Sequence, residues 1–476
     1  MSDLLQRGDL SERVVRANEK PVIADGDYIL VVLHRALRWA DNPVLEAAIA
    51  HAHALNMRIL VYCELDENHP HASDRLFYFT LGAWRSLAID LAHHNINCLQ
   101  FIRRKYDELD DDSDVPGAPI SRAAAVYIDE DHTHWDRARL QGILEIAKQA
   151  VFFVDASRLV PVRQLPEGLE TTPAFRKTHS PLRDRYAEWR RQTAEEIAEL
   201  LPKIERSPIS PQSHHNFADY ADDALVKLIS QCKIDHGIGI STAHPPTQGA
   251  IATRIATLKT EILTRYKWIR NNPALEYSTS QLSPYLHFGM LSPHQLYAEI
   301  ASVDVPKNYT WKFRDEFLTW REWSHYRAFQ SPNLHEFESL PDAARQTLLN
   351  HAADPRPEQA SFEDILSGNT ADLTWNAAQK EWLHTGWLHN NLRMYWAKQI
   401  LRFTASPQAA WQTACDLNDR LSLDGRDPAT YASMRWAFGE AKRGYSERPI
   451  YGWIAPKSDR AIIKRKGMSE WIESRN

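Results

Sequence analysis

The stretch Tyr28-Ile-Leu-Val-Val-Leu33 decides the fold class of the first third of the chain. Its unbroken run of apolar and β-branched residues is typical of a strand buried on both faces of a parallel sheet. Segment 43–55 then has apolar residues at helical spacing, as a crossover helix does. Because such crossovers are right-handed, we expect a doubly wound α/β domain with a parallel sheet over residues 1–160. Its further strands are expected at residues 59–65, 98–102, 124–128 and 151–154.

The rest of the chain changes character twice. Residues 161–245 are rich in charged residues, and we expect a helix at 180–201. Two proline-containing stretches interrupt the later part of this region, Ser207-Pro-Ile-Ser-Pro-Gln-Ser213 and His244-Pro-Pro246. We therefore expect residues 161–245 to form a connector. From residue 246 to residue 476 the apolar pattern is helical almost throughout. We therefore expect an all-helical second domain.

The composition argues against several classes of protein. A chain of 476 residues with 43% hydrophobic residues suffices for two packed cores. The four cysteines lack CxxC spacing, which argues against a disulfide framework and against a zinc or iron–sulfur site. No apolar run approaches the roughly 18 residues that span a bilayer, so we expect no membrane association. The scattered cysteines fit the reducing cytoplasm, and we also expect a monomer and no metal. The net charge of −6 argues against indiscriminate coating of nucleic acid but allows a local basic patch.

The segment Tyr277-Ser-Thr-Ser-Gln-Leu-Ser-Pro-Tyr-Leu-His-Phe-Gly289 places hydroxyls and free backbone amides at the start of an expected helix. Such a helix end can hold a phosphate, and it can equally be an ordinary Ser/Thr N-cap with proline in the first turn. The segment is also similar to the flavin-phosphate signature of the photolyase/cryptochrome family.

The resemblance extends over the whole chain. Arg35-Ala-Leu-Arg-Trp-Ala-Asp-Asn-Pro43 resembles the opening of that family's N-terminal α/β domain. Five later segments are similar to class II cyclobutane-dimer photolyases: Trp375-Asn-Ala-Ala-Gln379, Leu392-Arg-Met-Tyr-Trp-Ala-Lys398, Leu417-Asn-Asp-Arg420, Leu423-Asp-Gly-Arg-Asp-Pro428 and Glu447-Arg-Pro-Ile-Tyr-Gly452. His389-Asn-Asn-Leu-Arg-Met394 and Thr319-Trp-Arg-Glu322 look more like other classes, so the chain resembles a class II relative with mixed features.

The resemblance implies that the helical domain binds FAD. Arg393 would lie beside the flavin, and Asp424 and Asp427 would face its ring and sugar edges; a turn with a local Asp–Arg pair is the alternative for Asp424-Gly-Arg-Asp427. Ala429 stands where class II proteins usually carry an asparagine whose amide faces flavin N5, and alanine offers no acceptor there. The remaining residues implied to hold the cofactor are Tyr266, Thr279, Ser280, Leu282, Ser283 and Arg321.

The resemblance also implies a substrate pocket for a dimer that is flipped out of the duplex. Glu316 would hydrogen-bond the dimer, Trp320 would pack on it, and Met394 would lie at the flavin edge. A flipped dinucleotide needs an aromatic wall in place of lost stacking. A solvated helix face for Glu316 and core packing for Trp320 are the alternatives, and Tyr445 occupies the position of a second stacking tryptophan in class II proteins.

Twelve of the 16 tryptophans lie from Trp268 onward. Trp375 and Trp396 match the pair that relays electrons to the excited flavin in class II proteins, although core packing is the ordinary role of a buried tryptophan. A third relay position is Phe403 here. Any extension of the relay must therefore use another residue, such as Trp387, Trp411 or a tyrosine.

The resemblance implies light-dependent repair of cyclobutane pyrimidine dimers in DNA, by electron transfer from photoexcited reduced FAD. A (6-4) photolyase, which relies on a histidine, and a cryptochrome-like blue-light photoreceptor are the alternatives; His389 does not discriminate between them. An antenna chromophore, a deazaflavin or a folate, is a further possibility for the α/β domain. A local basic patch that includes Lys442 and Arg443 would grip the damaged DNA.

Overall fold

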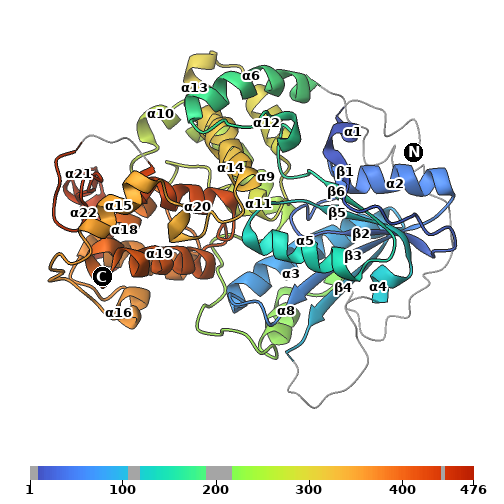
Figure 1. The fold of residues 1–476 in the computed structure, drawn as a ribbon, viewed down its shortest axis with the longest axis horizontal. Helices are drawn as coiled ribbons and strands as arrows, with labels where there is room; N and C mark the ends of the chain where they lie inside the picture. The colour runs from blue at the N-terminus through green and yellow to red at the C-terminus, as the bar shows by residue number, and fades with distance from the viewer. Residues whose placement is uncertain (1–8, 106–117, 189–216, 441–444) are drawn as a thin grey trace. The chain divides into compact units, whose positions relative to one another are not determined.

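The computed structural model describes residues 9–105, 118–188, 217–440 and 445–476, which form two compact units (Figure 1). The first unit takes its described residues from Met1–Ile240, Pro245–Ala252 and Leu282–Val303. The second takes them from Ser241–His244, Thr253–Gln281 and Asp304–Asn476. None of the described helices combines the length and the apolar character that a bilayer span requires.

The first unit contains a six-stranded sheet with the order β1-β6-β5-β2-β3-β4. All neighbouring strands are parallel except β1, which pairs antiparallel with β6. The five strands that the sequence predicts are all present, so the doubly wound parallel sheet is confirmed. The edge strand β1 was not predicted. The strands are β1 (Val14–Arg16), β2 (Tyr28–Val32), β3 (Ile59–Asp66), β4 (Asn97–Arg103), β5 (Ala123–Asp129) and β6 (Ala150–Val154).

The crossover helix α2 (Pro43–Leu55) forms as its sequence predicts. The Asn42 side chain accepts the backbone N–H of Val44 at 3.1 Å, and Pro43 occupies the first turn, where its missing N–H costs nothing. Asn56 ends the helix in the left-handed conformation, with φ of 52°. The other helices of this unit are α1 (Leu10–Arg13), α3 (Asp74–His93), α4 (Ala118–Ser121), α5 (His134–Ile146), η2 (Val162–Gln164), α6 (Thr172–Glu188), η3 (Phe217–Asp219), α8 (Asp222–Ile229), α11 (Ser283–His287) and α12 (Pro293–Ala301).

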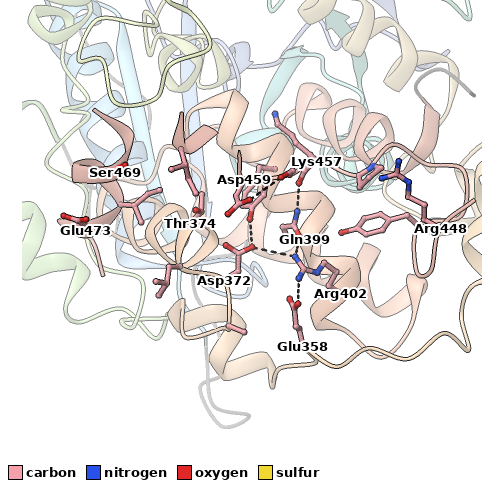
Figure 2. A pocket seen from close by; sticks show the side chains of 18 residues that line it. Glu358, Asp372, Thr374, Gln399, Arg402, Arg448, Lys457, Asp459, Ser469 and Glu473 are labelled. Carbon is pink, nitrogen blue, oxygen red and sulfur yellow. Dashed lines mark hydrogen bonds and ion pairs between the residues drawn. The ribbon is translucent and has the colours of Figure 1, made fainter. Parts of the chain in front are cut away.

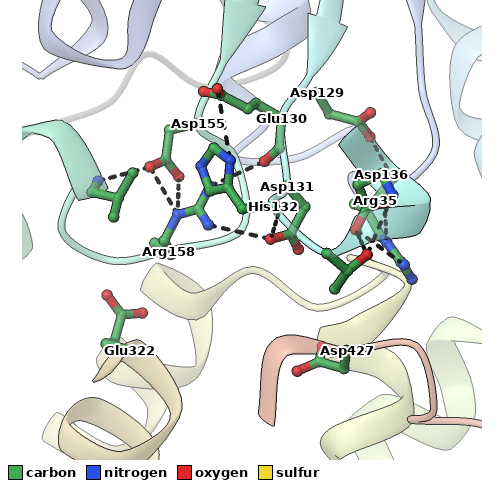
Figure 3. A network of polar contacts seen from close by, with 12 residues as sticks. Arg35, Asp129, Glu130, Asp131, His132, Asp136, Asp155, Arg158, Glu322 and Asp427 are labelled. Carbon is green, nitrogen blue, oxygen red and sulfur yellow. Dashed lines mark hydrogen bonds and ion pairs between the residues drawn. The ribbon is translucent and has the colours of Figure 1, made fainter. Parts of the chain in front are cut away.

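Buried ion pairs fix the loops at the carboxyl ends of β5 and β6 (Figure 3). Asp129, at the end of β5, accepts the backbone N–H groups of His34 at 2.7 Å and Ala36 at 2.8 Å. Beyond β6, Arg158 contacts Asp155 at 2.8 Å and Asp131 at 3.3 Å. Because buried charges need such partners, these contacts hold the loops in one arrangement.

The expected helix at 180–201 lies only partly within the described residues. Helix α6 begins earlier, at Thr172, and its described part ends at Glu188. Residues 189–201 and the proposed break at 207–213 lie outside the described part of the chain.

The second unit is helical, as the sequence predicts, and its described residues include no strand. Helix α9 (Gln248–Thr257) begins in the first unit and ends in the second. Two segments are π-helical, η4 (Leu258–Ile262) and η5 (Glu316–Arg321), whereas η7 (Trp436–Glu440) is interrupted by non-helical backbone at Phe438 and at Gly439, where φ is 112°. Such wide turns are rare and are frequent at functional sites. The other helices are α10 (Tyr266–Ile269), α13 (Lys307–Asp315), α14 (Glu322–Gln330), η6 (Phe337–Ser339), α15 (Asp342–Asn350), α16 (Phe362–Ser367), α17 (Leu373–Thr385), α18 (Asn390–Phe403), α19 (Pro407–Leu421), α20 (Pro428–Arg435), α21 (Arg460–Ile463) and α22 (Met468–Glu473).

Candidate functional site

A buried ion pair forms the centre of the candidate site. Arg393, in the first turns of α18, donates from Nη2 to Asp424 Oδ1 at 2.9 Å and to Ser422 Oγ at 3.2 Å. Arg393 is 8% exposed and Asp424 is 9% exposed, so water screens the pair weakly. The Ser422 hydroxyl also donates to Asp424. Two residues that lie 31 positions apart in the sequence are thereby held together.

The turn after α19 presents Asp424 to Arg393. A Cβ at Gly425 would lie 2.4 Å from the Asn418 carbonyl oxygen, so only glycine fits this close approach. Arg426 follows in the left-handed region with φ of 57°, and its backbone N–H donates to Asp419 Oδ1 at 2.8 Å. The Arg426 guanidinium also donates to the Asp419 carbonyl. The turn is therefore anchored to the end of α19.

Asp427 caps the next helix. Its Oδ1 accepts the backbone N–H of Ala429 at 2.9 Å, at the start of α20. Ala429 is half-buried and begins the helix with Pro428. One oxygen of Asp427 thus has a structural role, whatever the carboxylate contacts when a ligand is bound.

The donors and acceptors at this centre fit a flavin. Arg393 Nε is buried and makes no hydrogen bond to any described residue, so a donor is left over on a charged group that needs partners. The same guanidinium lies over the Trp382 ring, 5.1 Å from its centroid. A flavin ring offers carbonyl and ring-nitrogen acceptors to such a donor.

His244 is a further buried group near Asp424, although the sequence predicts only a chain break at this residue. Burial, followed by the Arg254 charge, lowers the pKa of His244 to about 3, while Asp424 acts in the opposite direction. The imidazole is therefore neutral at pH 7. Its ring lies 6.2 Å from that of Trp387.

The predicted phosphate segment does not form an ordinary Ser/Thr cap. Leu282 occupies the N-cap position of α11, without a side-chain cap bond, and Ser283 is already helical. Thr279 and Ser280 lie just before the end of a segment of the second unit, which closes at Gln281. Leu282 and Ser283 begin a segment of the first unit. Phosphate binding by the four residues stays a prediction.

Glu316 lies among cations rather than on a solely solvated face. Its Oε1 contacts Lys312 Nζ at 2.7 Å and Arg270 Nη1 at 3.0 Å. Tyr266 packs edge-on against Phe313 with 5.1 Å between ring centroids. Burial and, second, the Glu316 charge raise the pKa of the Tyr266 phenol. Glu316 is the first residue of the π-helical segment η5, and Tyr266 lies close enough to respond to its charge.

Trp320 belongs to an aromatic corner, and the sequence predicts only this one of its three tryptophans as a site residue. Its ring is edge-on to Trp436 at 5.3 Å and to Trp323 at 6.0 Å. Trp436 is 39% exposed, so the corner reaches the surface of the unit. The sequence predicts a stacking role for Tyr445 and does not point to Trp436. Tyr445 is 53% exposed.

Arg321 and Met394 have less distinctive surroundings. Arg321 Nη1 contacts Glu322 Oε1 at 3.4 Å. Met394 follows Arg393 on α18 and is half-buried. Lys442 and Arg443 lie outside the described residues.

Trp375 and Trp396 are brought together in a buried stack. Their ring centroids are 5.7 Å apart with an interplanar angle of 11°, and neither ring is exposed. Trp375 Nε1 donates to the Trp396 carbonyl at 3.1 Å, and Trp396 Nε1 donates to Gln379 Oε1 at 2.8 Å. Trp382 adds an edge-on contact to Trp396 at 5.0 Å. The three indoles, here called the tryptophan column, run from Arg393 through Trp382 and Trp396 to Trp375.

Trp382 was also missed, although its spacing held a signal. It lies seven residues after Trp375 on α17, and residues seven apart share one face of a helix. The two other tryptophans that the sequence offers for the relay, Trp387 and Trp411, make their ring contacts with residues outside the tryptophan column. Trp387 is near His244 and His389, and Trp411 packs edge-on against Phe438 at 5.3 Å.

The chain is similar to proteins named deoxyribodipyrimidine photo-lyase. It is 28% identical to the one from Methanothermobacter thermautotrophicus over 97% of this chain and 98% of the relative. It is 32% identical to the one from Oryza sativa subsp. japonica over 64% of this chain and 59% of that relative. No family model matches the chain.

Solved structures of the same fold cover nearly the whole chain. A class III photolyase from Agrobacterium tumefaciens has a TM-score of 0.63 at 16% identity, covering 96% of this chain and 87% of that one. A cryptochrome from Synechocystis sp. PCC6803 has a TM-score of 0.66 at 19% identity, with coverage of 94% and 88%. An archaeal photolyase from Sulfolobus tokodaii, described with two FAD molecules, has a TM-score of 0.59 at 16% identity, with coverage of 94% and 89%.

The α/β unit and the helical unit are both covered by solved photolyase and cryptochrome structures of the same fold. In sequence and in fold the chain is similar to proteins of the photolyase/cryptochrome family.

The capping role of Asp427 is testable separately from any ligand. We expect Asp427→Ala to lower the free energy of unfolding by about 1 kcal/mol, because the first turn of α20 loses its acceptor. Asp427→Asn keeps an acceptor and should change it far less. Urea unfolding midpoints of the two variants measure the difference; an asparagine variant as unstable as the alanine variant would contradict the capping role.

Proposed function

We propose that this protein is a DNA photolyase that uses FAD and blue light to split cyclobutane pyrimidine dimers. The buried Arg393–Asp424 pair, with a donor left over at Arg393 Nε, is the observation that carries the proposal. The name shared by the relatives supports the reaction class, and one relative matches over almost its full length. We place this activity in the cytoplasm, and assign it to a monomer acting on damaged DNA.

The cofactor residues divide by the part of FAD that each would hold. Arg393 and Asp424 would fix the flavin ring, because a cation and a hydrogen-bonded carboxylate match its acceptors and its ring N–H. The diphosphate, ribityl and sugar parts are assigned to Tyr266, Thr279, Ser280, Leu282, Ser283, Arg321 and Asp427. When bound and reduced, the flavin supplies the electron that light drives to the dimer.

The chain's own residues would receive and orient the flipped dimer. Glu316 is held in place by Arg270 and Lys312 and offers a carboxylate to the polar edge of the bases. Trp320 and Trp436 present two rings at right angles, which can replace the stacking lost on flipping. That stacking is worth about 1 to 3 kcal/mol per base. Met394, beside Arg393, would close the pocket at the flavin edge.

The surroundings of His389 favour cyclobutane dimers over (6-4) products. His389 caps α18, since its Nδ1 accepts the backbone N–H of Asn391 at 3.0 Å. Burial, followed by the Lys457 charge, lowers its pKa to about 3. A histidine that is neutral at pH 7 is a poor proton donor, and the (6-4) reaction relies on an active histidine.

Illumination of the purified, chemically reduced protein tests the proposal. One sample receives DNA with a cyclobutane dimer, another receives DNA with a (6-4) product, and matched samples stay dark. We expect dimer loss only in the illuminated cyclobutane sample, and a much smaller rate for Glu316→Gln. Glu363→Gln, on exposed α16, is the control variant. Repair of the (6-4) product alone, or of neither lesion, contradicts the proposal.

The stack of Trp375 and Trp396 leads to a separate prediction about photoreduction of the flavin in the Trp396→Phe variant. We expect this variant to lose photoreduction of the oxidised flavin, because the indole next to Trp382 and Trp375 is removed from the middle of the column. Dimer splitting should persist when the flavin is reduced chemically. Repair uses an electron that leaves the reduced flavin, and a flavin that is already reduced needs no electron from the tryptophan column.

Trp411→Phe is the matched control, because Trp411 is equally buried but contacts Phe438 and not the column. Absorption spectra recorded during blue illumination measure both variants. Normal photoreduction by Trp396→Phe would show that the relay runs elsewhere.

A further inference from the structure

The outer end of the tryptophan column lacks an oxidisable ring at the expected place. Phe403 packs edge-on against Trp375, with 5.3 Å between ring centroids, and a phenylalanine ring does not give up an electron in proteins. Trp387 and Trp411 make their ring contacts with other residues. An electron vacancy that reaches Trp375 therefore needs a donor of another kind.

Tyr395 is joined to the column in two ways. It is the neighbour of Trp396 on α18, and its hydroxyl donates to Asp372 Oδ2. The other oxygen of the same carboxylate, Oδ1, accepts the backbone N–H of Trp375 at 3.0 Å. Asp372 thus bridges the phenol of Tyr395 and the backbone of Trp375.

The Tyr395 phenol is buried, and its proton has one evident acceptor. The residue is 1% exposed, and burial, followed by the Asp372 charge, raises the pKa of the phenol. The phenol therefore stays protonated until it is oxidised, and an oxidised phenol is a strong acid. A carboxylate already hydrogen-bonded to that proton can take it at once.

Asp372 and Tyr395 both line a pocket of about 960 Å³ (Figure 2). Arg402 Nη1 lies 3.9 Å from Asp372 Oδ2, and the same guanidinium contacts Glu358 and Gln399. The charge of Asp459, which also lines the pocket, acts on Tyr395 as well. Small solutes that enter the pocket can therefore reach the wall formed by Asp372 and Tyr395.

We propose that Tyr395 is the terminal electron donor of the tryptophan column and that Asp372 accepts its proton. The inference rests on the proposed function, because the oxidant is the photoexcited oxidised flavin. One electron moves from Tyr395 to the oxidised tryptophan, which returns to its neutral state. The phenol O–H bond breaks and a new O–H bond forms on Asp372. A neutral tyrosyl radical and a neutral carboxylic acid result. A soluble thiolate that enters the pocket then gives one electron to the radical and becomes a thiyl radical, and Asp372 returns its proton to the phenol oxygen, which restores both side chains.

Flash excitation of the FAD-loaded protein tests this assignment. In the native protein we expect the absorption band and the electron paramagnetic resonance signal of a neutral tyrosyl radical, with a rise that slows in D2O. Tyr395→Phe should lose both signals and leave a tryptophan radical. Asp372→Asn should lose them too while Tyr395 is still present, because an amide does not accept the proton. Asparagine keeps an acceptor for the Trp375 N–H, so α17 retains its cap.

Tyr451→Phe is the matched control, since Tyr451 is a buried tyrosine of the same pocket whose hydroxyl donates to the Lys398 carbonyl at 3.2 Å. The tyrosyl signal of the Tyr451→Phe variant should equal that of the native protein. A full tyrosyl signal in Tyr395→Phe or Asp372→Asn, or none in the native protein, overturns the assignment. A native protein that forms the radical yet repairs no dimer would refute the proposed function and leave this inference standing. Thermal melting of each flavin-free variant confirms that it is folded.

Discussion

The ion pair between Arg393 and Asp424 is the constraint on which the candidate site depends. It fastens the first turns of α18 to the turn after α19, and the absence of a side chain at Gly425 lets that turn approach the end of α19. Breaking such a buried pair costs about 3 to 5 kcal/mol, because one charge is left without a partner. The helices around it are therefore held in one arrangement, as a site that must position a redox cofactor requires.

The same arginine also sets where the tryptophan column begins. Its guanidinium lies over Trp382, which contacts Trp396, which stacks on Trp375. Helices α17 and α18 supply all three rings, and Asp372 extends the contact to Tyr395 at the pocket wall. A continuous series of aromatic and hydrogen-bonded contacts thus connects the polar centre of the unit with solvent. Repair and photoreduction would share the flavin but use opposite directions of electron flow.

The order of apolar and polar residues along the chain predicts much of the fold, and contacts between distant residues determine the rest. The five longer strands and α2 could be predicted because burial and capping are visible in their own residues. Strand β1 could not, since its three residues pair through their backbone with β6. The π-helical turn at Glu316 depends on packing that no local propensity encodes. Motif matches named Arg393 and Asp424, but only the structure shows that they touch. Trp382 could have been found from its helical spacing, whereas Trp436 has no such signal.

The affinity of the flavin-free protein for FAD tests the central claim most directly. Titration with FAD, followed by flavin fluorescence, should show at least about tenfold weaker binding for Arg393→Gln and for Asp424→Asn, since a charge-assisted hydrogen bond is worth about 1.5 to 3 kcal/mol. Asp342→Asn, in an exposed pair with Arg345, should bind as the native protein does. Unchanged affinity in both variants of the buried pair, with the fold intact, would contradict the account.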